Sequence, residues 1–200
     1  MPRRTDARER MIDSARQLFR QQGYSQTAFS DVLAASGTPR GSVYFHFPGG
    51  KQELARSVAD LHIDATIDAV RALRSKARSP GALVSGYIRE SRDRLLSTDY
   101  TEGCAVAPLV TETLTAQPEL AHAVGHGFSR IIDELSAALT DLGVPANRAH
   151  ALAAHALAGV EGALIVSRAT RSVASFDALI VDLANLADTS VKEKNDEQCH

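Results

Sequence analysis

The chain has no tryptophan, only two cysteines, and aromatic side chains at just 5% of its 200 residues. Two cysteines far apart, without metal-ligand spacing, argue against a disulfide framework and fit a reducing cytoplasm. No apolar stretch approaches the ~20 residues that a membrane-spanning helix needs. The charged N-terminus also lacks the apolar core of a secretory signal. The sequence therefore predicts a cytoplasmic protein that does not enter a membrane.

The chain is otherwise composed like a globular protein, with 44% hydrophobic and 23% charged residues. This apolar content suffices for a buried core and excludes wholesale disorder. The charges are unevenly spread: residues 1–56 carry nine Lys and Arg against five Asp and Glu, whereas residues 57–200 carry thirteen against nineteen. This asymmetry favours a basic part that binds a polyanion and an acidic part with another role.

Helical periodicity dominates, and no window alternates apolar and polar residues as a half-buried strand would. Met11, Ile12, Ala15, Leu18 and Phe19, for example, fall on one face of a helix. The sequence therefore predicts an all-α fold. The expected helices cover 5–22, 51–74, 81–97, 103–115 (kinked by Pro108), 118–142, 146–168 and 175–190, with two short helices between the first two, capped by Thr27 and Thr38.

Residues 27–54 contain these two short helices, joined at Gly37. This is the pattern of a helix-turn-helix unit, whose second helix enters the DNA major groove. A purely structural corner between two helices is the alternative interpretation. The buried face of the second helix is expected to consist of Val43, Tyr44 and Phe47.

The other side of this second helix carries groups suited to DNA. Arg40 is the one long donor available for a bidentate contact with guanine. Gly41 removes a side chain where the helix approaches the duplex. Pro39, Ser42 and His46 are expected to project from the same side. Phosphate contacts, which position a protein without reading sequence, are expected from Thr27, Tyr44, His46 and Lys51.

Four ordered segments resemble the DNA-binding domain of the TetR family: Gly23-Tyr24-x-x-Thr27, Ala34–Gly37, Gly41–Phe47 and Lys51-x-Glu53-Leu54. The resemblance covers about residues 8–56. It implies an all-helical homodimer with an N-terminal three-helix DNA-binding domain and a C-terminal helical domain for ligand binding and dimerisation. We expect these domains at 1–50 and 51–191, followed by a polar tail at 192–200. The resemblance further implies phosphate contacts from Thr27, Thr38, Tyr44, His46 and Lys51, and base contacts from Pro39, Arg40, Gly41 and Ser42.

Two further features refine this resemblance. Pro39 stands where many members of the family carry a small or polar residue, and its missing donor leaves base reading to Arg40. The segment Phe47-Pro-Gly-Gly-Lys51, together with Glu102–Ala107, resembles the LmrA/YxaF-like branch of small-molecule-responsive repressors.

A homodimer would read two half-sites of a palindromic operator, one helical turn or a multiple apart. The last two expected helices carry small and apolar residues suited to such a contact, although burial within one chain is the alternative explanation. The expected dimer interface includes Ala154, Ala158, Gly162, Ile165, Phe176, Leu179 and Leu183.

A largely apolar small-molecule effector is expected to bind between the middle helices. Plain core packing is the alternative role for each apolar residue of this set. The expected pocket residues are Leu61, Tyr87, Ile88, Arg92, Cys104, Leu109, Glu112, His122, Phe128 and Ile131.

Two residue types invite other functions. Cys104 could act as a redox switch, but no basic cluster adjoins it in sequence, and a lone cysteine is usually a small buried hydrophobe. His122 and His126 have the i, i+4 spacing of two metal ligands, but no cysteine or carboxylate completes a set nearby. We therefore expect neither a metal nor a cofactor.

The sequence contains no nucleophile elbow, HExxH motif or glycine-rich phosphate loop, which argues against an enzyme. It predicts a ligand-responsive transcriptional regulator, most simply a repressor that a small molecule releases from its operator. A DNA-binding or architectural protein without a ligand is the alternative, and activation in place of repression is compatible with the same residues.

Overall fold

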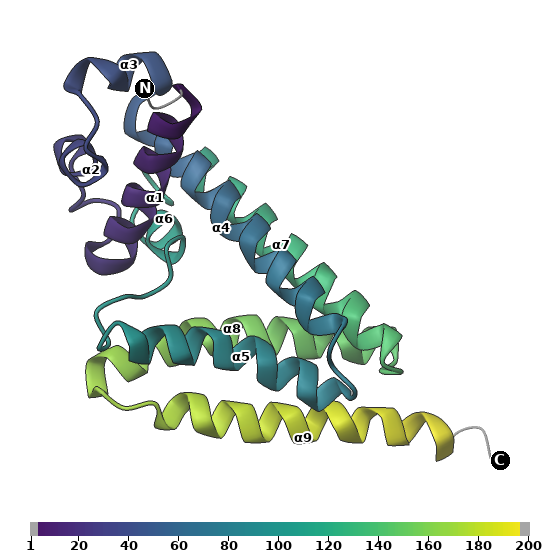
Figure 1. The fold of residues 1–200 in the computed structure, drawn as a ribbon. Coiled ribbons are helices and arrows are strands. Elements are labelled where there is room, and N and C mark those ends of the chain that lie inside the picture. The colour runs from purple at the N-terminus through teal and green to yellow at the C-terminus, as the bar shows by residue number, and fades with distance from the viewer. Residues whose placement is uncertain (1–3, 197–200) are drawn as a thin grey trace. The chain divides into compact units, whose positions relative to one another are not determined.

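The computed structural model describes residues 4–196, and helices are its only regular elements over that range (Figure 1). The predicted all-α fold is confirmed. In chain order the elements are α1 (Arg4–Gln22), α2 (Phe29–Ser36), the 3-10 turn η1 (Arg40–Ser42), α3 (Val43–His46), α4 (Gly50–Arg74), α5 (Pro80–Ser97), α6 (Ala107–Thr111), α7 (Pro118–Asp141), α8 (Ala146–Thr170) and α9 (Ala174–Asp196).

The chain divides into two compact units, and neither is continuous in sequence. Unit 1 consists of Met1–Asp64 and Cys104–Gly127, and unit 2 consists of Ala65–Gly103 and Phe128–His200. Helices α4 and α7 contribute residues to both units. The division therefore differs from the linear domains expected at 1–50 and 51–191. Helix α9 extends through residues 192–196 of the expected tail, and 197–200 lie outside the described residues.

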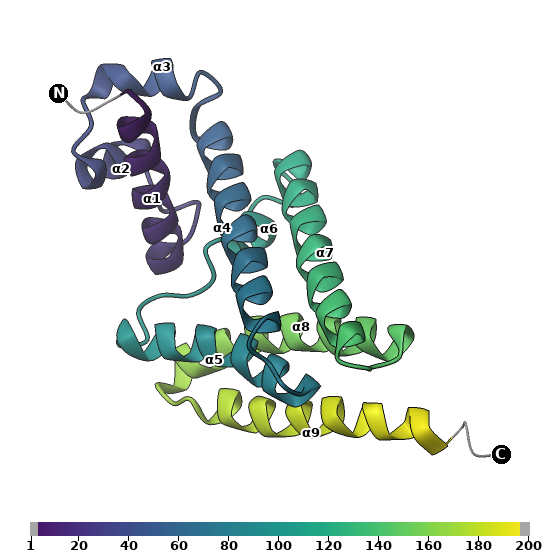
Figure 2. The ribbon, with the colours of Figure 1, turned by 45° about the vertical axis from the view of Figure 1, so that its right-hand side comes forward.

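Unit 1 is built on the apolar stripe of α1. Met11, Ala15 and Phe19 are buried, and the Phe19 ring meets the Tyr24 ring edge-on with centroids 5.5 Å apart. Figure 2 shows α1, α2 and α3 grouped beside the first half of α4, which adds Leu54 and other buried side chains to the same core. This packing holds the short helices, which are too short to be stable alone.

Unit 2 contains α5, α8 and α9, which lie side by side in both ribbon views (Figures 1 and 2). Phe176 of α9 and Ile88 of α5 are fully buried in this layer. Gly159 permits a close approach of α9 to α8, because a Cβ there would lie 2.7 Å from Cδ1 of Leu179.

The middle of the chain is less helical than expected. In place of a kinked helix over 103–115, α6 has five residues and Pro108 lies in its first turn. Proline lacks an N–H and disfavours helical geometry in the residue before it, so it is tolerated at a helix start and not in the interior. Helix α6 therefore begins just before the proline.

The two expected threonine caps also differ. Helix α2 is capped at Ala28, whose N–H donates to Asp31 Oδ2 at 2.9 Å, and η1 is capped at Pro39. Thr27 and Thr38 each lie one residue before these positions, where both side chains are buried. A buried hydroxyl bonded elsewhere is not available to cap a helix.

One helix within the described range, α8, is long and apolar enough to cross a bilayer by length and composition. Of its most apolar window, 44% is buried inside the structure. A core helix of a soluble protein passes the same test of length and composition. Helix α8 packs against α9 at Gly159.

Candidate nucleic-acid interface

The turn between α2 and α3 is fixed by several hydrogen bonds. Helix α2 is capped after Ser36 by Gly37, whose φ of +62° lies in the left-handed region that glycine adopts without strain. The Thr38 N–H donates to Leu33 O at 3.1 Å, and the hydroxyls of Ser36 and Thr38 are 2.9 Å apart. From α1, Arg10 Nε donates to Ser36 O at 3.2 Å. These bonds set the direction in which the chain enters η1.

The far end of the same segment is anchored by Phe47, which is fully buried. Its ring lies 6.4 Å from the Phe29 ring and beneath the guanidinium of Arg8, with Cζ 5.1 Å from the ring centroid. Arg8 also donates to Ser57 Oγ of α4 at 2.9 Å. Because Val43 is buried as well, the segment is held on its inner side at i, i+4 spacing.

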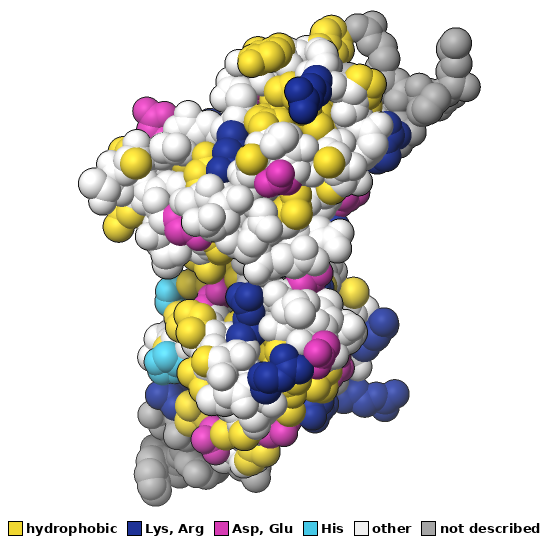
Figure 3. All heavy atoms as spheres, turned by 90° about the vertical axis from the view of Figure 1, so that its left-hand side faces the viewer, with side chains coloured by type: hydrophobic (Ala, Val, Ile, Leu, Met, Phe, Trp, Pro, Cys, Tyr) yellow, Lys and Arg dark blue, Asp and Glu magenta, His cyan; other side chains and the backbone are white. Residues whose placement is uncertain are grey.

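The outer side of this segment is exposed and carries a guanidinium group and aromatic rings. Tyr44 is 80% exposed and Phe45 60%, and Arg40 and Gly41 are exposed too. The His46 ring is half-buried and meets the Phe45 ring edge-on at 5.0 Å. On the face of unit 1 seen in the upper part of Figure 3, Lys and Arg side chains lie among hydrophobic ones, with some acidic side chains.

The exposure of Tyr44 corrects the expected buried face. Residues 40–42 form a 3-10 turn, which rotates by 120° per residue, and only four residues of α-helix follow. The buried pair is Val43 and Phe47, so Tyr44 and Phe45 lie on the opposite side. Phe45 was not among the residues expected on the exposed side. Its position midway between two buried residues four apart was the sequence signal for that exposure.

The expected phosphate-binding threonines are placed differently. Thr27 and Thr38 are buried, and the Thr27 hydroxyl donates to Gly23 O at 2.7 Å. Their hydroxyls therefore serve the fold of unit 1. Pro39 is exposed at the start of η1, and the side chain of Ser42 lies outside those that the structure describes.

Lys51 is half-buried at the start of α4, with Nζ 4.1 Å from the centroid of the Tyr24 ring. Burial lowers the pKa of Lys51, while the carboxylates of Glu112 and Asp31 oppose that shift. The cation is thus held against an aromatic face, a favourable contact for an ammonium group.

The segment after α6 fastens the loop that precedes α2. Glu112 Oε2 accepts the Ser25 N–H at 2.6 Å, and the Tyr24 hydroxyl lies 3.2 Å from Gln117 Oε1. Burial raises the pKa of Tyr24, and the hydrogen bond to Gln117 opposes that shift. We call Glu112 and Gln117 the α6–α7 clamp. It joins residues that are 87 and 93 positions apart in the sequence, within unit 1.

The expected effector pocket does not lie within one unit. Leu109, Ile88 and Ile131 are fully buried core residues, Glu112 belongs to the clamp, and Arg92 Nε is paired with Asp177 at 2.8 Å. The division places Leu61, Cys104, Leu109, Glu112 and His122 in unit 1, and Tyr87, Ile88, Arg92, Phe128 and Ile131 in unit 2.

Cys104 is the residue of this set with an unexpected neighbour. It is partly exposed and forms no disulfide, and its Sγ lies 3.9 Å from Nε2 of His62 on α4. No local sequence pattern indicates this pairing, because the two residues are 42 positions apart.

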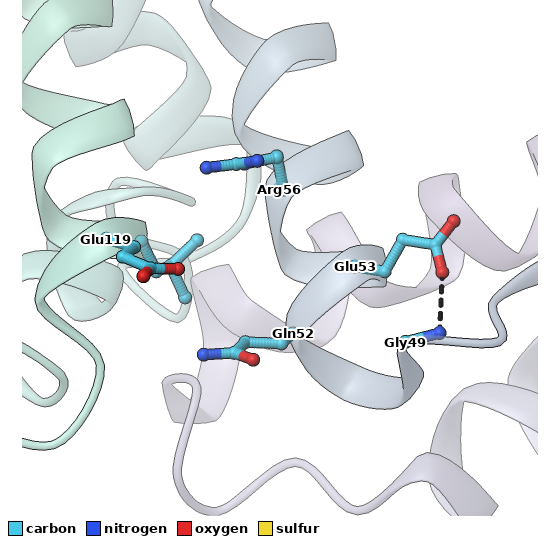
Figure 4. A pocket seen from close by; sticks show the side chains of 6 residues that line it. Gly49, Gln52, Glu53, Arg56 and Glu119 are labelled. Atoms are coloured by element: carbon cyan, nitrogen blue, oxygen red, sulfur yellow. Dashed lines mark hydrogen bonds between the residues drawn. The ribbon is translucent and has the colours of Figure 1, made fainter.

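Unit 1 has a pocket of about 210 Å³ between the first turns of α4 and α7 (Figure 4). Arg56 and Glu119 extend toward each other across it, whereas Glu53 points away and accepts the Gly49 N–H at 2.8 Å. Four of its six lining residues are charged or polar, unlike the apolar effector site expected from the sequence.

The expected dimer residues separate into two sets. On α8, Ala158, Gly162 and Ile165 are exposed, with Ile165 at 71%, and Ala154 is half-buried. On α9, Phe176 and Leu183 are buried in the chain's own core and Leu179 packs against Gly159, so burial within one chain explains these three. The exposed large apolar residues of α9 are Val181 and Leu186.

The described part of the chain contains no cluster of side chains that could hold a metal ion. His122 and His126 are both exposed, and no three His, Cys, Asp or Glu side chains within residues 4–196 are grouped to hold an ion.

Known proteins resemble both parts of the chain. Residues 11–58 match the family described as "Bacterial regulatory proteins, tetR family", and residues 80–180 match "Transcriptional regulator LmrA/YxaF-like, C-terminal domain". The HTH-type transcriptional regulator Rv0196 of Mycobacterium tuberculosis is 35% identical over 194 residues, which cover 94% of this chain and 97% of that protein. The regulator LmrA of Bacillus subtilis is 26% identical over 162 residues, covering 81% and 86%.

The fold is shared with solved structures. The regulatory protein TetR from Rhodobacter sphaeroides superimposes with a TM-score of 0.79 at 17% sequence identity, covering 90% of this chain and 97% of that one. The likeness in fold therefore extends beyond the helix-turn-helix to most of the molecule.

Proposed function

The chain belongs to the TetR family of transcriptional regulators, with a C-terminal domain of the LmrA/YxaF-like type, and on that premise we propose that it is a repressor released from a palindromic operator by a small molecule. It is a DNA-binding regulator and not an enzyme. We place its action in the cytoplasm, where its operator would be.

The observation that carries this proposal is the exposed outer side of residues 40–46. Its inner side is anchored by Val43 and Phe47, so the outer side is presented rigidly. Arg40 offers a guanidinium for guanine, and Tyr44 offers a hydroxyl for phosphate. A Cβ on Gly41 would meet nothing within 4 Å, so the fold of the chain does not require glycine there. Close approach of a duplex would require it.

The proposed homodimer contact is one stripe of exposed residues on α8. A Cβ at Gly162 would also meet nothing within 4 Å, and Ile165 is among the most exposed large apolar residues described. Small residues let two helices approach closely, and Ile165 adds apolar area at the contact. A second copy of this chain is the proposed partner. The exposed stripe consists of Ala151, His155, Ala158, Gly162, Ile165 and Ala169.

The effector is proposed to be a largely apolar small molecule that favours a conformation with reduced operator affinity. Operator and effector must then weaken each other's binding by the same factor, because the coupling is a single free energy. The support for this step is the family and the apolar side chains that α5 and α7 supply to unit 2, such as Tyr87 and Phe128.

The decisive experiment is selection of binding sites from random duplex DNA with the full chain, followed by fluorescence anisotropy. We expect a palindrome whose affinity falls steeply with salt. Lys51→Ala is expected to weaken binding to all sequences alike and to reduce the salt slope by about one, whereas Lys76→Ala, at an exposed position after α4, should leave both unchanged. Recovery of no preferred duplex would refute the proposal.

A second titration tests whether a small molecule releases the protein from its operator or whether the protein binds DNA constitutively. The operator complex is titrated with a panel of apolar small molecules, and we expect at least one class to release the DNA. Release by none of them would favour the constitutive alternative. Reporter expression from the selected operator, with and without the protein, gives the sign of regulation.

A further inference from the structure

The pair formed by Cys104 and His62 has no part in the function proposed so far. Cys104 begins the second segment of unit 1, and His62 lies near the point where α4 leaves that unit. Cys104 is partly exposed, and Nε2 of the imidazole lies 3.9 Å from its sulfur, within hydrogen-bonding distance for sulfur. A thiol with a base in reach is the arrangement that activates cysteine as a nucleophile.

We propose that Cys104 and His62 form a covalent sensor site for soft electrophiles, of the class of α,β-unsaturated carbonyl compounds. This inference rests on the proposed regulatory function and adds a second effector class to it. Cys104 is the reacting residue, and His62 positions and accepts the proton. The ligand of this site differs from the apolar effector because it becomes covalently bonded to the chain.

The reaction balances without an oxidant or reductant. The thiol proton passes to His62 Nε2, and the sulfur attacks the β-carbon of the conjugated C=C bond. The π electron pair moves onto the carbonyl oxygen as an enolate. The imidazolium then returns the proton, which reaches the α-carbon. One S–C and one C–H bond form, while one S–H bond and one C=C π bond are lost.

The structure also supplies a route from this thiol to the DNA-binding elements. Ala105, Val106 and Leu109 follow Cys104 and are fully buried, so the segment is firmly packed. Close-packed side chains transmit added volume because they have little room to absorb it. Three residues beyond Leu109 lies Glu112, whose carboxylate holds the Ser25 N–H.

An adduct on Cys104 therefore displaces the α6–α7 clamp. Release of the clamp loosens the loop before α2, which sets the position of the helix-turn-helix. Covalent modification is thus expected to lower affinity for the operator, with every step of the route lying inside unit 1.

The first test measures reactivity and needs no DNA. Full-length protein with Cys199→Ser, which keeps Cys104 as its one thiol, is treated with N-ethylmaleimide at neutral pH and followed by mass spectrometry. We expect Cys104 to react about tenfold faster than glutathione. His62→Asn should remove this advantage, and the ultraviolet absorbance of the thiolate should fall with it. A rate no faster than that of glutathione, or one unaffected by His62→Asn, would overturn the proposal.

His62→Gln serves as a second variant should His62→Asn fail to give the native circular dichroism spectrum.

The second test compares operator binding before and after alkylation. We expect at least a tenfold loss of affinity, absent in Cys104→Ser. Undiminished binding by the alkylated protein would overturn the sensing role. If the unmodified protein binds no operator, the proposed repressor function and the sensing role fail together, while the reactivity result decides the thiol site independently.

Discussion

The two proposed contact surfaces are built in opposite ways. In unit 1, residues 40–46 form only a 3-10 turn and a four-residue helix, which hydrogen bonds hold at one end and the buried Phe47 ring holds at the other. In unit 2, the exposed stripe of α8 belongs to a helix of 25 residues that is held by its own backbone and by α9. The first surface depends on side chains from α1 and α4, and the second depends on helix periodicity.

This difference decides how each surface fails. A substitution on the α8 stripe leaves the helix intact and changes only what can approach it. A substitution among the anchors of residues 40–46, such as Phe47, is expected to move this whole segment. The proposed contact residues Arg40 and Gly41 lie between these cases, because both are exposed and none of the hydrogen bonds described above involves the Arg40 side chain.

The largest effect is expected from Ala158→Glu, which places a charge in the middle of the α8 stripe. Burial of an unpaired carboxylate at a dimer contact is strongly unfavourable, so the protein should become monomeric. Operator affinity should fall by about 100-fold or more, because two linked half-sites bind far more tightly than one. Light scattering during size-exclusion chromatography and anisotropy measure the two effects.

Ala82→Glu on α5 is the matched control, since it adds the same charge at an exposed position of the same unit. It should remain dimeric. A dimeric Ala158→Glu protein would show that the stripe on α8 is not the interface.

Arg40→Ala is expected to cost about 1–3 kcal/mol of operator binding, because a bidentate contact with guanine is lost. The loss should be confined to one base position in each half-site. Binding to a series of single-base operator variants measures it. Arg89→Ala removes an exposed arginine from α5 and should change nothing. A uniform loss over all operator variants would reassign Arg40 to a phosphate contact.

Gly41→Ala separates packing within the chain from packing against DNA. Because a Cβ there meets open space, thermal stability should be unchanged or slightly higher. Operator binding should weaken by about 1 kcal/mol, roughly fivefold in Kd, if the duplex lies against the backbone. Gly125→Ala on α7, where a Cβ also meets nothing within 4 Å, is the control and should bind normally. Full binding by Gly41→Ala would place the duplex elsewhere.

The smallest effect concerns Glu112→Gln. Since Glu112 raises the pKa of Lys51, its neutralisation should lower that pKa further, which NMR titration of the Lys51 side chain can follow. Burial already places the Lys51 pKa below its ordinary 10.5, so the folded state releases this proton first. Stability therefore rises with pH through the window between the two values. An unchanged Lys51 pKa in the variant would contradict the contact.

The sequence was informative where a residue's role depended on local spacing. The four α8 positions predicted from small and apolar residues at helical intervals, from Ala154 to Ile165, are exposed or half-buried, and Arg40, predicted from an ordered motif, is exposed. Periodicity failed at Phe176 and Leu183 of α9, because a helix that is apolar on two sides does not show which side faces its own chain.

Other features depended on contacts between distant segments. Thr27 matched a motif position, but its side chain is buried and its hydroxyl donates to Gly23 O in the same loop. Lys51 also matched the motif, and its ammonium group lies against the Tyr24 ring. Cys104 and His62, and Glu112 and Ser25, are brought together only by the tertiary fold. No local pattern encodes such pairs, so a single sequence could not predict them.

The discontinuity of unit 1 has a practical consequence for dissecting this protein. A fragment that stops after Asp64 would contain the whole helix-turn-helix and still lack Glu112 and Gln117, leaving Ser25 and Tyr24 without these bonds. Chimaeras that exchange sensory regions between such regulators therefore have to retain residues 104–127 with the N-terminal segment. Grafts joined at a single crossover are expected to express as poorly folded, protease-sensitive chains.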